Sequence, residues 1–422
     1  MYKKNTRILL VDDAFLPLLA DMQAHGAKLD AVIYAGDGEA PTGLLSYEML
    51  IGEAAAVPDA LRRGDDLLGL FYTGGTTGQP KGVMLTHASF MTSSLAVLGG
   101  GLATAGGAFL HVAPMFHLAD LAIGSVNWIL GNTHVFLPSF SPEALIDAIE
   151  CHQVTHTLLV PTMVQMLVDH PAMQQGRDLS SLQSIAYGGS SIAEAVIDRA
   201  LAALPKVRFF QAYGMTELSP VATILDWEYH TAEGRKLDKL RSAGRAALCC
   251  EVRIVDGDGT EVPTGETGEI TVRGPNVMRG YWNKPEQTAE AVRDGWMHTG
   301  DAGYLDADGF LFVVDRVKDM IISGGENIYS AEVENALAQH PAVQTCAVIG
   351  IPSEKWGESV HAFVILRPGS EVAENDLIAH PVSTGFEWQL RARFGSGQLR
   401  GLARACRNSN ADGKRRDSGD GQ

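Results

Sequence analysis

Strand-like and helix-like segments alternate along the first half of the chain, and this alternation restricts the folds that it can adopt. Apolar runs at Arg7–Val11 and Thr133–Leu137 predict strands. Segments with apolar residues at helical spacing follow them at Leu16–His25 and Pro142–Cys151, the second with Ser141 as its expected N-cap. Repeated alternation of this kind predicts βαβ units, in which helices cover a parallel sheet.

Beyond residue 244 the pattern changes to short strands separated by turn residues. Glu251–Val255 precedes the turn Asp256-Gly-Asp-Gly259, and Phe310–Val314 follows a similar turn. Such spacing predicts β-hairpins, and residues 319–370 predict a small α+β unit. We therefore expect an α/β protein. It has a large N-terminal lobe of parallel and mixed sheets flanked by helices, a β-rich subdomain, and a small α+β C-terminal lobe.

The composition excludes several classes of protein. The chain has 422 residues, of which 45% are hydrophobic, and its net charge is −17. A globular core is therefore expected, and the excess of acidic residues argues against nucleic-acid binding. The five cysteines include no CxxC pair, which indicates reduced thiols and a cytoplasmic location. No transmembrane segment is expected, whereas peripheral membrane contact and the oligomeric state are left open.

A loop rich in glycine and threonine follows the expected strand Leu68–Tyr72. Its sequence is Thr73-Gly-Gly-Thr-Thr-Gly-Gln-Pro-Lys81. The backbone N–H groups and hydroxyls of such a loop, with the charge of Lys81, suit the binding of a polyphosphate. The loop differs from a Walker A loop because Pro80, and not a glycine, precedes the lysine. An ordinary surface loop with turn glycines is the alternative interpretation.

Further motifs follow this loop in order along the chain. They are Pro114-Met-Phe-His117, Tyr187-Gly-Gly-Ser190, Tyr213-Gly-Met-Thr-Glu217, Gly268-Glu-Ile270, Arg279-Gly-Tyr-Trp-Asn283, Gly295-Trp-Met-His-Thr-Gly-Asp301, Asp315-Arg-Val-Lys-Asp319, Ser323-Gly-Gly-Glu-Asn327 and Trp356-Gly-Glu358. With these motifs the chain resembles, over residues 5–380, the adenylate-forming (AMP-binding) superfamily and in particular its acyl-CoA synthetases and fatty-acid–CoA ligases. The resemblance implies that ATP and Mg²⁺ activate a small-molecule carboxylic acid as an acyl-adenylate, which coenzyme A then attacks as co-substrate.

The resemblance also implies roles for individual residues. The implied catalytic residues are Thr76, Lys81, His117, Glu217 and Lys318, of which Glu217 and Thr76 would bind the metal. The implied residues for nucleotide and coenzyme A are Thr73, Gly74, Gly75, Thr77, Gly78, Gly188, Gly189, Ser190, Gln211, Tyr213, Gly214, Met215, Thr216, Asp301, Arg316, Gly324 and Gly325. Among them, Tyr213 would stack on adenine, while Asp301 and Arg316 would bind the ribose hydroxyls.

Several of these residues also have plain structural interpretations. Glu217 suits Mg²⁺, which takes carboxylate and phosphate oxygens, but it equally suits a turn. His117 would separate the acyl pocket from the thiol tunnel, or it is a core or rim histidine. Lys318 would be the hinge of the small lobe, and Gly324 would let the pantetheine arm approach the backbone. An exposed lysine and a glycine turn are the alternatives there.

Two departures from the family pattern affect the expected activity. We expect part of the N-terminal half of the large lobe to be missing, so that the large AMP-binding domain spans residues 1–317. A small, incomplete domain is expected at 318–380, and a basic, non-homologous tail at 381–422 replaces the family's final lysine segment. The expected function is ATP-dependent ligation of a fatty or similar apolar acid to coenzyme A. Loading of a carrier protein, or a non-catalytic remnant that binds nucleotide or acyl ligand, are the alternatives.

Overall fold

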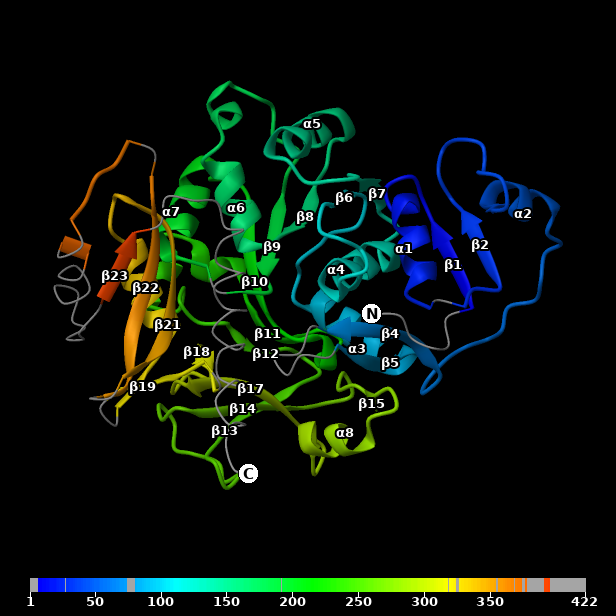
Figure 1. The fold of residues 1–422 in the computed structure, drawn as a ribbon. Helices are drawn as coiled ribbons and strands as arrows, with labels where there is room; N and C mark the ends of the chain where they lie inside the picture. Colours follow the sequence, from blue (N-terminus) through cyan, green and yellow to red (C-terminus); the bar gives the residue numbers. More distant parts are fainter. Residues whose placement is uncertain are drawn as a thin grey trace, which may run out of the picture. The chain divides into compact units, whose positions relative to one another are not determined.

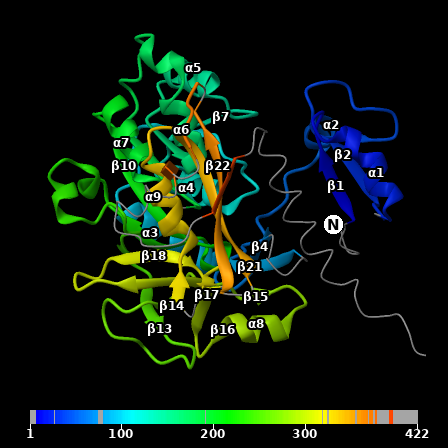
Figure 2. The ribbon, with the colours of Figure 1, turned by 60° about the vertical axis from the view of Figure 1, so that its left-hand side comes forward.

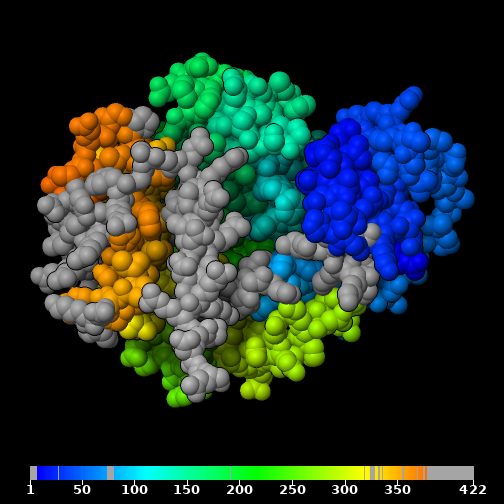
Figure 3. Space-filling view, viewed as in Figure 1, coloured from blue at the N-terminus to red at the C-terminus, as the bar shows by residue number. Residues whose placement is uncertain are grey.

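The computed structural model describes residues 7–394 except 27, 74–79, 191, 318, 324–325, 354–355, 368, 374–375 and 378–390. Figure 1, Figure 2 and Figure 3 draw all other residues in grey. The chain divides into two compact units, one of residues 1–62 and 74–81, and one of residues 63–73 and 82–422.

The first unit contains a small parallel sheet with short helices. Its strands are β1 (Ile8–Val11), β2 (Ala31–Tyr34) and β3 (Leu45–Ser46), and its helices are η1 (Leu16–Leu18), α1 (Leu19–Ala24) and α2 (Tyr47–Glu53). The single helix predicted over 16–25 is divided, because a 3₁₀ turn that contains Pro17 comes before α1. The hydroxyl of Tyr34 donates to Oδ1 of Asp13 at 2.5 Å and connects β2 to the end of β1.

The second unit is built around a seven-stranded sheet (Figure 1). Its order is β12 (Arg245–Ala246), β11 (Val221–Leu225), β10 (Arg208–Gly214), β9 (Ser184–Gly188), β8 (His156–Leu159), β6 (Ala108–His111) and β7 (Thr133–Phe136). The strands from β10 to β7 are parallel to one another, whereas β11 is antiparallel to both of its neighbours, β10 and β12. The predicted parallel sheet is therefore confirmed.

Helices cover both faces of this sheet (Figure 2). The helices are α5 (Pro142–His152), α6 (Pro161–Val168) and α7 (Glu194–Ala203) on one face, with α3 (His87–Gly99) and α4 (Leu118–Ile129) on the other. Successive residues of β10 point into the cores on opposite faces of the sheet: Phe209 packs with α5–α7, and Phe210 packs with α3 and α4. As predicted, Ser141 caps α5, accepting a hydrogen bond from the N–H of Ala144 at 3.1 Å.

The chain beyond residue 244 forms the predicted β-rich region. One sheet contains β13 (Glu251–Val255), β14 (Gly268–Arg273), β17 (Trp296–Leu305), β16 (Val292–Arg293) and β18 (Leu311–Arg316). Another sheet pairs β15 (Gly280–Tyr281) of this region with β5 (Lys81–Thr86), which is followed by β4 (Leu67–Thr73), both from earlier in the chain; α8 (Pro285–Ala291) follows β15. The carboxylate of Asp256 accepts from the N–H groups of Asp258 and Thr260, so this acidic pair closes a hairpin turn.

A further sheet forms the C-terminal α+β region. It consists of β20 (Glu326–Ile328), β19 (Ile321–Ser323), β22 (Gly357–Leu366), β21 (Val343–Ser353) and β23 (Arg391–Phe394), with α9 (Ser330–Ala338) packed on it. Asp315 of β18 connects this region to the preceding sheet. Its Oδ2 accepts from the N–H of Ser330 at 2.6 Å and from the hydroxyl of Ser330 at 2.8 Å.

Candidate active site

Two of the motif segments, and the segment Val160-Pro-Thr162, follow the carboxyl ends of adjacent parallel strands. In the sheet, Leu159 of β8 is paired with Tyr187 of β9, and Ala212 of β10 is paired with Gly188. The segments after β8, β9 and β10 therefore leave the same edge of the sheet. In open α/β sheets, ligands bind in the crevice outside this edge.

Close backbone approach requires glycine at two of these strand ends. A Cβ atom added at Gly188 would lie 2.2 Å from the carbonyl oxygen of Ala212, and one added at Gly214 would lie 1.9 Å from that of Pro220. Both distances are shorter than any Cβ contact allows. These glycines therefore let β9, β10 and the segment before β11 pack backbone to backbone beside the site.

Tyr213, Asp301 and Arg316 meet beside the end of β10. The hydroxyl of Tyr213 donates to Oδ2 of Asp301 at 2.8 Å, and Nε of Arg316 lies 3.8 Å from Oδ1. Asp301 and Arg316 are paired residues of the antiparallel strands β17 and β18. Burial raises the pKa of the Asp301 carboxyl and also raises the pKa of Tyr213. The sequence predicted all three residues for the nucleotide site, and the structure brings them together.

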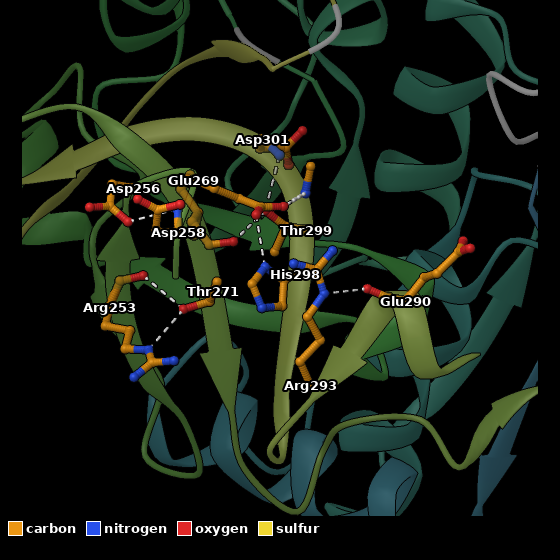
Figure 4. Close-up of polar contacts among 12 residues, drawn as sticks. Arg253, Asp256, Asp258, Glu269, Thr271, Glu290, Arg293, His298, Thr299 and Asp301 are labelled. Carbon is orange, nitrogen blue, oxygen red and sulfur yellow. Dashed lines mark hydrogen bonds and ion pairs between the residues drawn. The ribbon is translucent and has the colours of Figure 1, made fainter. Parts of the chain in front are cut away.

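A second layer of hydrogen bonds holds Asp301 in place (Figure 4). The hydroxyl of Thr299 accepts from the N–H of Asp301 at 3.1 Å and donates to the carbonyl of Ile270 at 2.8 Å. Glu269 accepts from the N–H of Gly300 at 3.1 Å and contacts Nδ1 of His298 at 2.7 Å. Glu269 and His298 lie within the motifs, but their pairing across β14 and β17 could be found only from the fold.

Glu217 is a buried carboxylate one turn beyond β10. It lies in the 3₁₀ turn η3 (Thr216–Leu218), its side chain is 4% exposed, and its Oε1 accepts from the hydroxyl of Tyr281 at 2.8 Å. The N–H of Met278 donates to its carbonyl oxygen at 2.8 Å. Burial and the nearby charge of Glu217 raise the pKa of Tyr281. Tyr281 was not among the predicted site residues, although it lies within a motif.

The chemistry of Glu217 suits a hard cation. Mg²⁺ is bound by one or two carboxylates together with phosphate oxygens and water. A carboxylate that is buried, and already oriented by a phenol, meets that requirement at the strand edge where a nucleotide would lie. Across the residues that the structure describes, no cluster of three or more His, Cys, Asp or Glu side chains suited to a metal ion occurs.

The remaining predicted residues are distributed over neighbouring elements. Thr73 ends β4 and Lys81 begins β5, its neighbour in the sheet. His117 is exposed and directly precedes α4, beside Phe116, which is 82% exposed. Gln211 lies in β10, and its Oε1 is 3.5 Å from the hydroxyl of Tyr187.

The other predicted residues fall into two groups. Those that follow the ends of β9 and β10 are Gly189, Ser190, Met215 and Thr216. Gly74, Gly75, Thr76, Thr77, Gly78, Lys318, Gly324 and Gly325 lie outside the described residues.

The fold combines a parallel sheet covered by helices on both faces, a β-rich region and a small C-terminal α+β region. With Tyr213, Asp301, Arg316 and Glu217 grouped beside the strand ends, these features define an α/β protein of the adenylate-forming type. The chain belongs to the AMP-binding enzyme family, which matches residues 6–282. Residues 332–390 match the AMP-binding enzyme C-terminal domain. The family predicted from the motifs is therefore confirmed.

Individual relatives differ in the acids that their names specify. The chain is 45% identical over 320 residues to a feruloyl-CoA synthase of an Amycolatopsis species, covering 75% of this chain and 62% of the relative. It is 36% identical over 393 residues to the fatty acid–[acyl-carrier-protein] ligase ScoC of Streptomyces coeruleorubidus, covering 92% and 73%. The chain thus spans less than two thirds of the length of the feruloyl-CoA synthase.

A solved structure with the same fold contains nucleotide and metal. The O-succinylbenzoate coenzyme A synthetase of Bacillus subtilis, in complex with ATP and magnesium ion, aligns with a TM-score of 0.76 at 32% identity. The alignment covers 92% of this chain and 75% of that one. Within the described part of the chain, none of the helices is long and apolar enough to cross a membrane.

Proposed function

We propose that the chain is an ATP-dependent acid–thiol ligase, which converts a carboxylic acid to its acyl-adenylate and then to the coenzyme A thioester. The observation that carries the proposal is the position of Tyr213, which lies between the Asp301–Arg316 pair and the buried carboxylate of Glu217. Its hydroxyl contacts Asp301, which is paired with Arg316, and four residues later Glu217 is buried against Tyr281. The short segment from Tyr213 to Glu217 thus brings together groups suited to an adenine and a metal-bound phosphate, and it contacts the Asp301 carboxylate of β17, which suits a ribose.

Each group suits one part of ATP. The carboxylate of Asp301 can accept hydrogen bonds from ribose hydroxyls, to which Arg316 can donate. The ring of Tyr213 offers a face for adenine, with Gly188–Ser190 and Gln211 along the base edge. The β- and γ-phosphates would be bound by the phosphate loop, whose residues are Thr73, Gly74, Gly75, Thr76, Thr77, Gly78 and Lys81. Beside the α-phosphate would lie Gly214, Met215 and Thr216. Glu217, with Thr76, would hold Mg²⁺, which neutralises phosphate charge when it is bound.

The reaction that follows is a transfer of the acyl group in two steps. A carboxylate oxygen attacks the α-phosphorus, the bond from that phosphorus to the pyrophosphate oxygen breaks, and pyrophosphate leaves. The thiol of coenzyme A then attacks the acyl carbon and AMP leaves, because AMP is a far better leaving group than an oxide. The protein's contribution is to align these groups and to exclude water from the mixed anhydride.

For the acid we propose an apolar carboxylate, of which a fatty acid is one candidate and an aromatic acid another. Val160, Pro161 and Thr162 follow β8 at the same sheet edge and would form the acyl wall, and His117 would stand between acyl site and thiol. The relatives that carry feruloyl and fatty-acid names support this range. We further propose that Lys318 is a hinge, and that Gly324 and Gly325 lie beside the pantetheine arm.

The domain boundaries and the location in the cell complete the proposal. We propose an AMP-binding domain over 1–317, a small C-terminal domain over 318–380 and a basic segment over 381–422. The C-terminal family match ends at residue 390, and β23 follows at 391–394, paired with β22. A cytoplasmic location is proposed from the cysteine pattern.

The direct test is pyrophosphate release from the full-length chain given ATP, Mg²⁺ and a panel of fatty and aromatic acids. We expect release with at least one acid and a drop of at least about a hundredfold in Glu217→Gln, because the amide keeps the Tyr281 contact but loses the charge. Asp258→Asn, which changes an exposed turn residue, is the matched control and should leave the rate unchanged.

A second measurement separates full catalysis from a remnant. If ATP with every acid gives no pyrophosphate and preformed acyl-adenylate with coenzyme A gives no thioester, while nucleotide still binds in a titration, the chain is a non-catalytic binding protein and the proposal is wrong. If preformed acyl-adenylate and coenzyme A give thioester although ATP and acid give no product, only the adenylation half has been lost.

A further inference from the structure

Cys249 and Cys250 are adjacent in the chain, and their sulfur atoms lie only 3.5 Å apart. Consecutive side chains of a strand point to opposite faces, so this proximity has a local cause. The N–H of Cys250 donates to the carbonyl of Ala247 at 2.8 Å and closes a tight turn before β13. The turn directs both sulfur atoms to one side. Both residues are half-buried, and Leu248 beside them is 83% exposed.

Backbone packing and a sulfur contact hold the turn of residues 247–250 in place. A Cβ atom added at Gly274 would lie 2.3 Å from the carbonyl oxygen of Cys249, so the backbone of the turn rests against the end of β14. The sulfur of Cys250 also lies 3.6 Å from the carbonyl oxygen of Val221. The two sulfur atoms are therefore placed before any ligand arrives, and little ordering is required when one binds.

The two thiols have different acidities. The hydrogen bond from Cys250 lowers the pKa of Cys249, while the same bond and burial raise the pKa of Cys250. One sulfur is therefore the nucleophile and the other keeps its proton. Two sulfurs bound at about 2.3 Å to one atom are about 3.8 Å apart at the tetrahedral angle, and they are closer at the narrower angles of a pyramidal three-coordinate centre. The observed separation falls in this range.

We propose that Cys249 and Cys250 form a bidentate dithiol site for a soft, three-coordinate electrophile, of which a trivalent organoarsenical is the type. The arsenic atom of such a compound keeps its bond to the organic group, so two protein sulfurs complete its three-coordinate shell. Soft thiolate donors favour soft ions of this kind.

The reaction balances without an oxidant or a reductant. For an arsenoxide, the Cys249 thiolate forms the first As–S bond and the arsenic-bound oxygen takes a proton to become a hydroxyl. Cys250 then forms the second As–S bond, and its proton leaves with that hydroxyl as water. The product is a nine-membered dithioarsenite ring that closes through the peptide between the two residues, with arsenic still trivalent.

The experiment uses phenylarsine oxide and the full-length, reduced chain under native conditions. One equivalent is added, the remaining thiols are alkylated, and the modified cysteines are mapped by mass spectrometry. We expect Cys249 and Cys250 to be protected together, while exposed Cys151 is alkylated as in the untreated protein. A dithiol such as 2,3-dimercaptopropanol should remove the arsenical, whereas an equal concentration of a monothiol should not.

The variants make the outcome decisive. Cys249→Ser and Cys250→Ser should each weaken phenylarsine oxide binding at least tenfold, and Cys151→Ser should leave it unchanged. Circular dichroism spectra that match the wild type would show that each variant is folded. Equal binding in wild type and both serine variants, or release by a monothiol, would overturn the site. Because the readout is a mapped adduct, it stands apart from any ligase activity.

Discussion

The hydroxyl of Tyr281 donates a 2.8 Å hydrogen bond to Oε1 of Glu217, and the two side chains are 5% and 4% exposed. Tyr281 lies in β15, in a different sheet from the strand β10 that leads to Glu217. The bond therefore joins two sheets through the carboxylate that we assign to the metal. A buried charge needs such partners, because its desolvation is otherwise uncompensated.

The first prediction concerns the loss of that bond. Tyr281→Phe should lower the free energy of unfolding by about 1.5–3 kcal/mol, the usual contribution of a hydrogen bond to a charged group. Urea unfolding followed by fluorescence measures the change. Tyr47→Phe, at an exposed position of α2, is the control and should change the free energy by less than about 0.5 kcal/mol. Equal effects of both substitutions would contradict the assignment.

Much of this arrangement could be predicted from the sequence, and particular residues show where prediction ended. The apolar runs of β1 and β7 and the cap at Ser141 carry their information locally, as periodicity and capping chemistry. Tyr213, Asp301 and Arg316 were predicted for one site from their motifs, and they do meet.

The contacts of Tyr281 with Glu217 and of Glu269 with His298 could not be predicted in the same way. Each joins segments that are separated in sequence: Tyr281 of β15 contacts a turn after β10, and Glu269 of β14 contacts His298 of β17 across a pairing with an irregularity between Glu269 and Thr271. Sheet register is fixed by tertiary packing, which no local pattern encodes. The turn that brings Cys249 to Cys250 is likewise set by contacts at Gly274 and Val221.

The second prediction is a pH dependence of nucleotide binding. Burial raises the pKa of Asp301 above its ordinary value of 3.8. If the ionised carboxylate binds the ribose, acidification should weaken ATP binding at a higher pH than an exposed aspartate would. Calorimetric titrations of ATP over a pH series measure this. Asp301→Asn should bind ATP about tenfold more weakly at neutral pH, which corresponds to about 1.4 kcal/mol, and should lose the acid dependence.

Asp301 also gives an opposite expectation for stability. A carboxyl whose pKa is raised in the folded protein stabilises the fold most below its unfolded pKa, and this stability is lost as pH rises through the folded pKa. At neutral pH the ionised side chain is therefore a cost to the fold. Asp301→Asn should consequently unfold at the same urea concentration as the wild type or at a higher one. A clear destabilisation would show that the carboxylate supports the fold.

The third prediction concerns acid unfolding through His156. Its Nε2 accepts from the N–H of Thr104 at 3.2 Å, so Nδ1 carries the proton and donates to Ser184 at 2.8 Å. Burial lowers the pKa of His156 from 6.5 to about 4. The folded state thus keeps the ring neutral, and the associated stability is present above pH 6.5 and is lost as pH falls toward 4. The loss should reach roughly 3 kcal/mol.

Urea unfolding between pH 7 and pH 4 measures this slope. His156→Gln should unfold at lower urea at neutral pH but lose less stability on acidification than the wild type. His25→Gln, at an exposed position, should keep the wild-type slope. If the slope is the same in all three proteins, protonation of His156 does not drive the acid transition.

The last prediction tests the strand pairing that positions the site. Gly188 and Gly189 are adjacent, but they demand glycine for different reasons. At Gly189 the backbone φ is +84° and no atom lies within 4 Å of an added Cβ, so alanine there meets only backbone strain. That strain costs about 1–2 kcal/mol. At Gly188 the added Cβ would be 2.2 Å from the carbonyl oxygen of Ala212, an atom of the neighbouring strand that cannot rotate away.

Gly188→Ala must therefore force β9 and β10 apart, and we expect it to cost about 3 kcal/mol or more, beyond the usual range for an overpacked core. Gly189→Ala should cost less, about 1–2 kcal/mol. Because Tyr213 follows Ala212 directly, the displacement at Gly188 should also weaken ATP binding in whatever protein remains folded. Urea unfolding and ATP titration of both variants check the two expectations. A smaller loss in Gly188→Ala than in Gly189→Ala would mean that Gly188 is not paired with Ala212 in the folded protein.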